Sequence, residues 1–369
     1  MADFLHNYVN FHAYDLTAET LEYALAEESA SNRARLISET VDSIGRTSLI
    51  IAIFRNNLPL LVYLLDSLEQ SAICRLIESG NGMHIAADHG HSEVVTCVLQ
   101  SVSSELRQRL MKFKNFEGQI ALHYAIRSGH TETVKCMLKE LSEGAMYEVM
   151  QVRSDAGSTA FHYGALGNNA DIMNCLLLAI PSQEQRLKLL SIQDNKRQLP
   201  IDCAAKHVRP FAMKCIVNSI SREQLLELME LEKICGNPVL HFAAFAGCTN
   251  TIKCMLQPLT RDQRYKLIKM TGRLGITAMH TAAWCGHIKT IQCMVDSVST
   301  VKQKLLLDMR DMNNQTALEI VLQKGLPQAA DLIAQWRLQV EARCRRHEGT
   351  LQNLLLLIRE YLKMERKFK

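Results

Sequence analysis

The sequence is poor in aromatic residues, in turn formers and in long apolar runs. Phe, Tyr and Trp make up 6% of its 369 residues, and it holds 17 Gly and 7 Pro. A β-sandwich or barrel needs more aromatic, β-branched and turn-forming residues, so this composition favours helices. No apolar run, including that of residues 354–358, approaches the roughly 20 residues that cross a bilayer. Since 47% of the residues are hydrophobic, we expect a soluble chain with a sizeable core.

The chain also lacks a recognisable secretory leader and a strong overall charge. Its first residues, "MADFLHNYVNFHAYDL", contain no basic segment followed by an apolar run, so we expect no Sec-type signal peptide. Twelve cysteines then favour a reducing compartment, and we expect a cytoplasmic protein. The net charge of +4 is too small to indicate a partner. It is uneven, because residues 337–369 carry nine Lys and Arg against four Asp and Glu.

Motifs of catalysis and metal binding are missing as well. The sequence contains no phosphate-binding G-x-x-x-x-G-K-[ST], no G-x-S-x-G, no zinc-binding H-E-x-x-H and no cysteine pair at zinc-finger spacing. Outside the repeat described next, the Asp, Ser and His residues form no pattern that indicates a catalysed reaction. We therefore expect a protein that is not an enzyme, with no catalytic residues, no cofactor and no metal site.

A sequence motif of about 39 residues recurs along the chain. Its clearest marker is the histidine of "ALHYA", His123, and the equivalent position recurs at intervals of 39 or 40 residues. A weaker copy, "GRTSLIIAI", has Ile50 at this position. We call this position the anchor. The residues at the anchor of the other copies are His84, His162, Asp202, His241, His280 and Glu319.

Each copy also repeats the residues around the anchor. Glycine often stands five residues before it and six after it, and a small residue stands two after it, as in "GITAMHTAAWCGHIKTIQCMV" from Gly275. Glycine supplies positive φ in turns and at the ends of helices, and small residues allow helices to pack closely. Over residues 45–336 the pattern resembles the ankyrin repeat, "G-x-T-x-L-H-x-A-A-x-x-G-H-x-x-x-V-x-x-L-L".

The resemblance implies an all-α repeat solenoid, in which each repeat has a short β-hairpin turn and two antiparallel helices. The copies exceed the common ankyrin length of about 33 residues, and the excess follows the second helix, where we expect an extra short helix. Three of these segments have capping-box spacing: Ser182 with Gln185, Ser221 with Gln224 and Thr260 with Gln263.

We predict three parts in the chain. Residues 1–44 would form an N-terminal helical cap made from a partial repeat. Residues 45–336 would form a solenoid of seven to eight repeats. Residues 337–369 would form a basic C-terminal helical cap or tail.

Cysteine recurs 13 residues after the anchor, inside the expected second helix. Stacked helices lie about 8–10 Å apart, whereas a disulfide needs Cα atoms within roughly 7 Å and zinc needs sulfurs at about 2.3 Å. Because free cysteine behaves as a small hydrophobe, we interpret these residues as packing positions rather than as a disulfide or metal ladder. Cys344, in the basic segment, is the thiol to test first for reactivity. The six residues are Cys97, Cys136, Cys175, Cys215, Cys254 and Cys293.

The histidines raise the alternative of a metal site. His84, His89 and His91 lie close together, but no two of them are spaced i, i+4 on one helix. In the ankyrin family the anchor histidine hydrogen-bonds the backbone of the neighbouring turn. Asp202 and Glu319 are expected to make polar contacts in its place. We therefore assign the histidines to structure.

The resemblance also implies where a partner binds. Solenoids bind partners on an extended concave face, which in ankyrin repeats is formed by the turn tips and the exposed side of the first helix. The residue four after the anchor is expected on that side. These residues are Asp88, Arg127, Leu166, Lys206, Phe245, Trp284 and Gln323, and those at the turn tips are Asn115, Phe116, Asp155, Lys196, Arg273 and Asn313.

Phe245 and Trp284 fall on consecutive repeats. Aromatic anchors dominate the energetics of protein interfaces, so we expect these two residues to be principal contacts for a partner protein. The alternative is that both side chains pack between neighbouring first helices.

Three functions remain open at this point. We prefer a non-enzymatic adaptor, scaffold or inhibitor that binds a protein partner as a monomer. The second is an effector that an intracellular bacterium delivers to the host cytoplasm, since such bacteria make ankyrin-repeat proteins. The third is a protein that binds nucleic acid or an acidic membrane through residues 337–369, where Leu351, Leu354, Ile358 and Tyr361 share one helix face.

Overall fold

The computed structural model describes residues 17–26, 28–42, 45–231, 237–326 and 330–346. Within these ranges the chain is helical, and its only β pairings are two isolated bridges, Val41–Thr47 and Thr271–Thr277. The chain divides into two compact units. Unit 1 comprises the residues up to Ala204 together with 218–220, and unit 2 comprises 205–217 and the residues from Ser221 onward.

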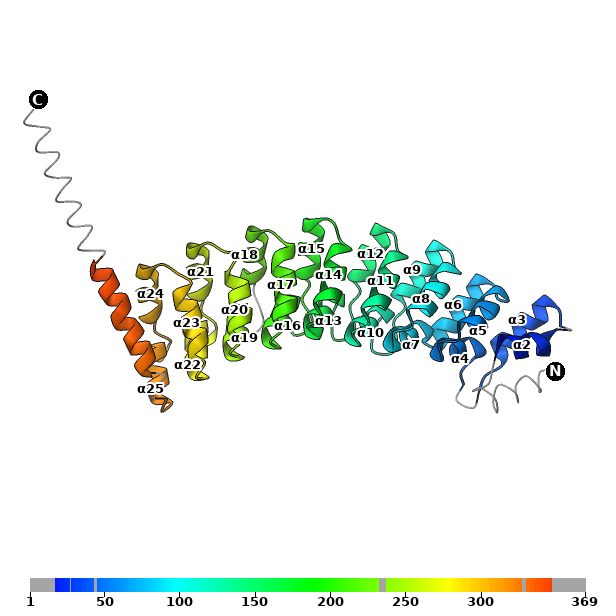
Figure 1. The fold of residues 1–369 in the computed structure, drawn as a ribbon, viewed down its shortest axis with the longest axis horizontal. Coiled ribbons are helices and arrows are strands. Elements are labelled where there is room, and N and C mark those ends of the chain that lie inside the picture. Colours follow the sequence, from blue (N-terminus) through cyan, green and yellow to red (C-terminus); the bar gives the residue numbers. More distant parts are fainter. Residues whose placement is uncertain (1–16, 27, 43–44, 232–236, 327–329, 347–369) are drawn as a thin grey trace, which may run out of the picture. The chain divides into compact units, whose positions relative to one another are not determined.

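Unit 1 contains successive groups of three helices, preceded by a pair (Figure 1). Its helices are α2 (Ala18–Leu25), α3 (Ala30–Glu39), α4 (Ser48–Phe54), α5 (Leu58–Asp66), α6 (Gln70–Ser79), α7 (Gly82–His89), α8 (Ser92–Gln100), α9 (Ser104–Lys112), α10 (Ala121–Arg127), α11 (Thr131–Lys139), α12 (Glu143–Met150), α13 (Ala160–Gly167), α14 (Ala170–Leu178) and α15 (Gln183–Leu190).

Unit 2 repeats the same order of three helices. The bounds of α16 (Pro200–Lys206) and α17 (Pro210–Ser219) each include residues of both units. The helices within unit 2 are α18 (Arg222–Glu230), α19 (Val239–Phe245), α20 (Thr249–Leu256), α21 (Arg261–Ile268), the 3-10 helix η1 (Arg273–Gly275), α22 (Ala278–Trp284), α23 (Ile288–Asp296), α24 (Thr300–Leu307), α25 (Ala317–Gln323) and a helix over residues 330–346.

Within each unit, equivalent helices of successive repeats pack side by side. In unit 1 the first helix α10 contacts α7 and α13, the second helix α11 contacts α8 and α14, and the third helix α12 contacts α9. In unit 2 the first helix α22 contacts α19 and α25, and α23 contacts α20. This stacking confirms the predicted all-α repeat solenoid, with an extra short helix in each repeat.

Helical periodicity explains where the core lies. In α8 the buried residues Val94, Val95, Val98 and Leu99 form two apolar pairs one turn apart, which is the pattern of a helix with one buried face. First helices carry small buried residues instead. Ala86 in α7 and Ala125 in α10 are fully buried, and their size lets neighbouring first helices approach closely.

Short turns join the repeats, with a single bridge or none in place of regular strands. In the turn before α10, the amide of Asn115 donates to the carbonyl of Gln119 at 2.9 Å. The Asn115 Oδ1 accepts the amides of Glu117 and Gln119, each at 3.0 Å. The next turn binds the first, because the Asp155 amide donates to the Glu117 carbonyl at 3.0 Å. Asn115 therefore builds the turn.

The third helix begins with a side-chain cap in most repeats. Ser221 with Gln224 and Thr260 with Gln263 form the reciprocal capping boxes that their spacing predicts. At α15 the Ser182 hydroxyl accepts the Gln185 amide, but no reciprocal bond is present. The box prediction therefore holds for two of the three segments, and the third has a one-sided cap.

An arginine of the third helix satisfies carbonyls at the ends of second helices. Arg264 Nε donates to the Leu256 carbonyl at 2.8 Å, and its Nη1 donates to Ser297, in the next repeat, at 3.2 Å. The last carbonyls of a helix have no partner within it. The extra helix therefore caps its own repeat and fastens it to the next.

Helices at both ends extend the stack. At the start, α2 contacts the second helix α5, and α3 contacts α4. At the end, residues 337–346 lie against α24, because Arg337 pairs with Asp308 at 2.8 Å and the Cys344 thiol approaches the Thr300 carbonyl at 3.9 Å. Residues 347–369, on which part of the predicted cap or tail falls, lie outside the described residues, as do 1–16.

The glycine that ends each first helix permits a test of packing in unit 1. Gly90 and Gly129 both have positive φ, +75° and +83°. A Cβ at Gly90 would lie 2.6 Å from the His130 ring, whereas a Cβ at Gly129 meets nothing within 4 Å. Backbone strain alone costs about 1–2 kcal/mol for alanine at positive φ. We expect Gly90→Ala to lower the free energy of unfolding by about 1 kcal/mol more than Gly129→Ala, measured by urea denaturation. Equal losses would contradict the contact.

Candidate functional site

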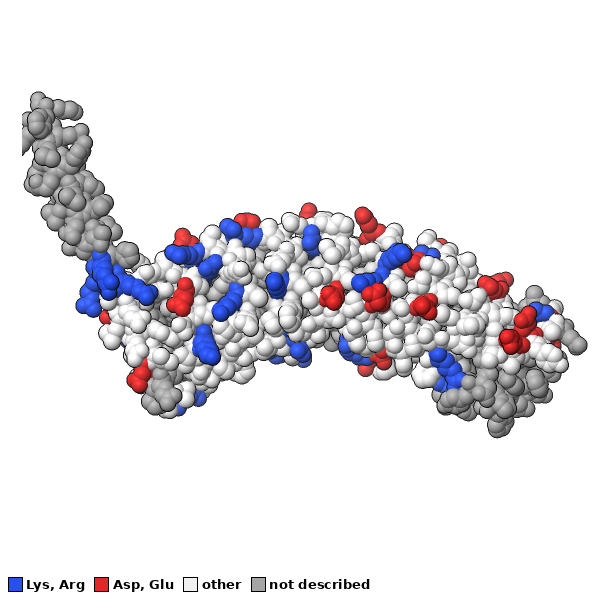
Figure 2. All heavy atoms as spheres, viewed as in Figure 1, with Lys and Arg blue, Asp and Glu red and all other residues white. Residues whose placement is uncertain are grey.

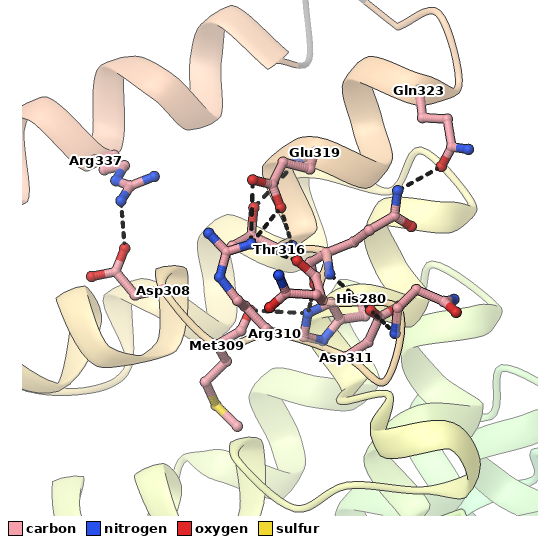
Figure 3. Close-up of polar contacts among 12 residues, drawn as sticks. His280, Asp308, Met309, Arg310, Asp311, Thr316, Glu319, Gln323 and Arg337 are labelled. Carbon is pink, nitrogen blue, oxygen red and sulfur yellow. Dashed lines mark hydrogen bonds and ion pairs between the residues drawn. The ribbon is translucent and has the colours of Figure 1, made fainter.

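Four of the five anchor histidines, His84, His162, His241 and His280, hydrogen-bond a carbonyl of the next turn. In unit 1 the His162 Nδ1 accepts the Thr159 amide at 3.1 Å, and its Nε2–H donates to the Gln198 carbonyl, in the following turn, at 3.0 Å. In unit 2 His280 bonds the Thr277 amide at 3.2 Å and the carbonyls of Met309 and Gln315 at 3.1 Å each (Figure 3). These bonds confirm the structural role that the ankyrin resemblance implies.

Burial keeps these imidazoles neutral. It lowers the pKa of His123 to about 3, with smaller effects from the nearby charges of His84 and Lys114. Burial also lowers the pKa of His84, His162 and His280, and their bonds to backbone carbonyls oppose the shift only in part. A neutral ring with one donor and one acceptor suits a bridge between an amide and a carbonyl.

At two anchor positions a carboxylate stands in place of histidine and, of the two bonds in this bridge, makes only the one to the local amide. The Asp202 Oδ2 accepts the Leu199 amide at 2.9 Å, and the Glu319 Oε2 accepts the Thr316 amide at 2.7 Å. Glu319 also pairs with Arg310 at 3.1 Å (Figure 3). The predicted polar contacts are confirmed, although a carboxylate accepts the local amide and cannot donate a bond to a carbonyl.

A second set of histidines follows the glycine that ends the first helix. His130 bonds the Asp88 carbonyl at 2.8 Å, His287 bonds the Phe245 carbonyl at 3.1 Å and His91 bonds the Phe54 carbonyl at 3.3 Å. Each ring thereby reaches the end of the preceding first helix. In the described part of the chain, no group of three His, Cys, Asp or Glu residues could hold a metal ion.

The repeated cysteines are half-buried, so they pack less deeply than the small-hydrophobe interpretation suggests. Burial raises the thiol pKa of Cys97, Cys175, Cys254 and Cys293. A thiol with a raised pKa is protonated at neutral pH, and it is therefore a weak nucleophile and metal ligand. No disulfide forms among the cysteines that the structure describes.

In unit 1 the predicted surface residues are largely engaged with one another. Asp88 accepts the Ser128 hydroxyl at 2.6 Å and lies 3.8 Å from the Arg127 guanidinium, which also stacks over Tyr124. Leu166 is half-buried. Phe116, at a turn tip, is 87% exposed. The first helices α7 and α10 therefore present paired charges, whereas Phe54 at the end of α4 is 41% exposed.

In unit 2 the corresponding residues are exposed to solvent. Phe245, at the end of α19, is 67% exposed, and Trp284, at the end of the adjacent helix α22, is 57% exposed. Neither is buried between first helices, which was the alternative. Lys206 is also exposed. The side chain of Arg273 lies outside the described part of the structure.

A pocket of about 350 Å³ adjoins Trp284. Its wall includes Leu274 and Ile276 from the turn before α22 and Ile320 from α25. Sequence reasoning missed these residues because it followed the single position four after the anchor. It also missed Lys324, whose ammonium lies 3.4 Å from the centroid of the Trp284 ring. The contact joins neighbouring repeats, so only the repeat spacing could have indicated it.

The positive charge of unit 2 extends beyond its C-terminal helix. The described residues of unit 2 before 337 include fifteen Lys and Arg and nine Asp and Glu, whereas those of unit 1 include seventeen and twenty-one. Figure 2 shows a further cluster of Lys and Arg at the described end of the helix over residues 330–346. No helix within the described ranges is long and apolar enough to cross a membrane.

Comparison with known proteins finds a family match over part of the chain. Residues 83–188 match the family model described as Ankyrin repeats (3 copies). Solved structures that resemble the chain include the ankyrin repeat domain of Bcl-3, a member of the IkappaB family, with 15% identity, a TM-score of 0.47, and coverage of 75% of this chain and 94% of that one. The human ASB11 ankyrin repeat domain has 18% identity, a TM-score of 0.48, and coverage of 68% and 96%. No curated protein matches the sequence.

Proposed function

We propose that this ankyrin-repeat protein is a non-enzymatic interaction module that holds a partner protein on the first helices and turns of unit 2. The observation that carries the proposal is the exposure of Phe245 and Trp284 on adjacent first helices. Ankyrin repeats are protein-interaction units, and the family match establishes that the chain contains them. The module would act as an adaptor, scaffold or inhibitor, by positioning or covering its partner.

Energetics favour these two residues as the centre of the interface. A Phe or Trp side chain buries about 150–250 Å² at an interface, and each Å² of apolar surface removed from water contributes about 25 cal/mol. Each aromatic residue could therefore supply a few kcal/mol of binding free energy. We extend the proposed surface to Lys206 in unit 2, and we place Asp88, Arg127, Leu166 and Phe116 on a second, more polar surface in unit 1.

Capture from a cytosolic lysate tests the proposal. Wild-type protein is compared with a Phe245→Ala/Trp284→Ala double variant and with Tyr23→Ala, a matched removal of an aromatic residue in unit 1 that is 87% exposed and lies outside both surfaces. We expect a protein partner that wild type and Tyr23→Ala retain, and that the double variant binds at least about 100-fold more weakly. Because the two residues are exposed, all three proteins should unfold at similar urea concentrations. A partner bound equally by wild type and the double variant would place the interface elsewhere.

Two contacts of the C-terminal helix support the proposal that it caps the stack of repeats. Val340 is buried, and the Arg337–Asp308 pair holds the helix to α24. We propose that residues 337–346 cap the last repeat, and that the protein acts as a cytoplasmic monomer. Arg345 is exposed, so binding of an acidic membrane or nucleic acid would involve the outer side of this helix together with residues 347–369.

A further inference from the structure

We propose that the pocket beside Trp284 binds a protein segment in which a large apolar side chain lies next to an Asp or Glu. The apolar side chain enters the pocket, and the carboxylate pairs with Lys324. This inference rests on the proposed function, because it names the chemistry of the partner at the surface already assigned to it.

The pocket has the size and lining of a site for a side chain. Its volume of about 350 Å³ lies near the lower end of the range for ligand sites, about 300–1,000 Å³. Leu274, Ile276 and Trp284 give it an apolar wall, and Ile320 closes it from α25. Leu274 is 61% exposed, and therefore an entering apolar group would remove its surface from water.

The position of Leu274 is fixed by the neighbouring turn. Its φ is +60°, a conformation that a bulky residue rarely adopts. Its carbonyl accepts the Met312 amide, from the next turn, at 3.1 Å. Met312 is 70% exposed, so the rim at this point is also apolar. The structure thus holds an exposed leucine at the mouth of the pocket in a strained turn.

The charges around the pocket favour an acidic partner. The Lys324 ammonium lies over the Trp284 ring and forms no ion pair among the described residues. Asp311 lines the pocket, where its Oδ1 accepts the amides of Asn313 and Gln315 at 2.9 and 3.0 Å, and Glu319 pairs with Arg310. An acidic residue in the partner would therefore meet an available cation.

Two first helices of unit 1 carry charges where α19 and α22 of unit 2 carry aromatic residues. At the ends of α7 and α10 the residues four after the anchor are Asp88 and Arg127, which lie 3.8 Å apart as a charged pair. Entry of an apolar side chain between them would separate opposite charges. In unit 2 the same positions hold Phe245 and Trp284, and the cation is supplied by Lys324 from the next repeat.

Selection of peptides tests the pocket without a known partner. A displayed library of random twelve-residue peptides is selected against the full chain at about 0.15 M salt. We expect the enriched peptides to share a large apolar residue within two positions of Asp or Glu. If no consensus emerges, or if it lacks the acidic residue or the apolar residue, the proposal is wrong.

Charge reversal makes the test specific. The chain has two tryptophans, Trp284 and Trp336, so Trp336→Phe leaves Trp284 as a fluorescent reporter of peptide binding. We expect Leu274→Ser and Lys324→Glu to weaken the selected peptide at least tenfold. The Lys324→Glu protein should regain affinity for a peptide whose acidic residue is replaced by Lys. A control variant, Lys139→Glu, removes an exposed lysine at the end of the second helix α11 in unit 1 and should leave the affinity unchanged. Equal affinity of wild type and both pocket variants would overturn the proposal.

The outcomes also separate this inference from the function on which it rests. If Phe245→Ala/Trp284→Ala abolishes capture of a protein partner, but Leu274→Ser and Lys324→Glu do not affect it, the interaction surface stands and the pocket is wrong. If peptides bind the pocket as expected but the double variant captures the same proteins as wild type, the pocket stands and the proposed interaction surface is wrong.

Discussion

Replacing His280 with alanine is expected to lower the free energy of unfolding by about 3 kcal/mol or more. The His280 side chain is 2% exposed and bonds the Thr277 amide on one side and the carbonyls of Met309 and Gln315 on the other. A buried polar group that loses its partner costs about 1–3 kcal/mol, and here at least two such groups lose theirs. The measurement is urea denaturation at pH 7.5.

His287 provides the control, because it is a histidine of the same repeat with a simpler environment. Its ring makes one bond, to the Phe245 carbonyl at 3.1 Å, at an exposed site. An exposed carbonyl that loses this bond can be solvated by water, so His287→Ala should cost about 0.5–1.5 kcal/mol. Similar losses for the two variants would show that the bridge between turns at His280 contributes little to stability.

The sequence predicted the fold well because the repeat multiplies weak signals. One copy of "ALHYA" followed by glycine indicates little, but the same residues at a constant period fix the phase of every helix. The third helices were predictable for the same reason, since capping residues recur at their starts. Ser182 shows the limit of this approach: its spacing matches a capping box, yet its bond is one-sided, because spacing does not determine the rotamer of Gln185.

The candidate site was predictable only in part. Repeat position placed Phe245 and Trp284 on consecutive first helices, and the structure shows both exposed. Repeat position could not show that Asp88 and Arg127 lie within 3.8 Å of each other, because that depends on side-chain conformations across a repeat boundary. The pocket was missed for a related reason, since its wall joins residues of one turn to residues of the next repeat.

Acidification from pH 7.5 to pH 5 is expected to destabilise unit 1. The pKa of His123 falls from an ordinary 6.5 to about 3 in the folded chain because the ring is buried. Below pH 6.5 the unfolded chain therefore binds a proton that the folded chain excludes. The stability contributed by the neutral ring is complete above about pH 6.5 and is lost as the pH falls toward 3. At pH 5 the loss from His123 alone is about 2 kcal/mol.

Other anchor histidines act in the same direction, because burial also lowers the pKa of His84 and His162 in unit 1 and of His280 in unit 2. The measurement is the urea midpoint at intervals between pH 7.5 and pH 5. In a His123→Leu variant, one titrating group is gone, so its midpoint should fall less steeply with acidification than that of wild type, even if its stability at pH 7.5 is lower. A wild-type midpoint that stays constant across this range would mean that the folded chain admits these protons, and that the anchor rings are hydrated rather than sealed between the turns.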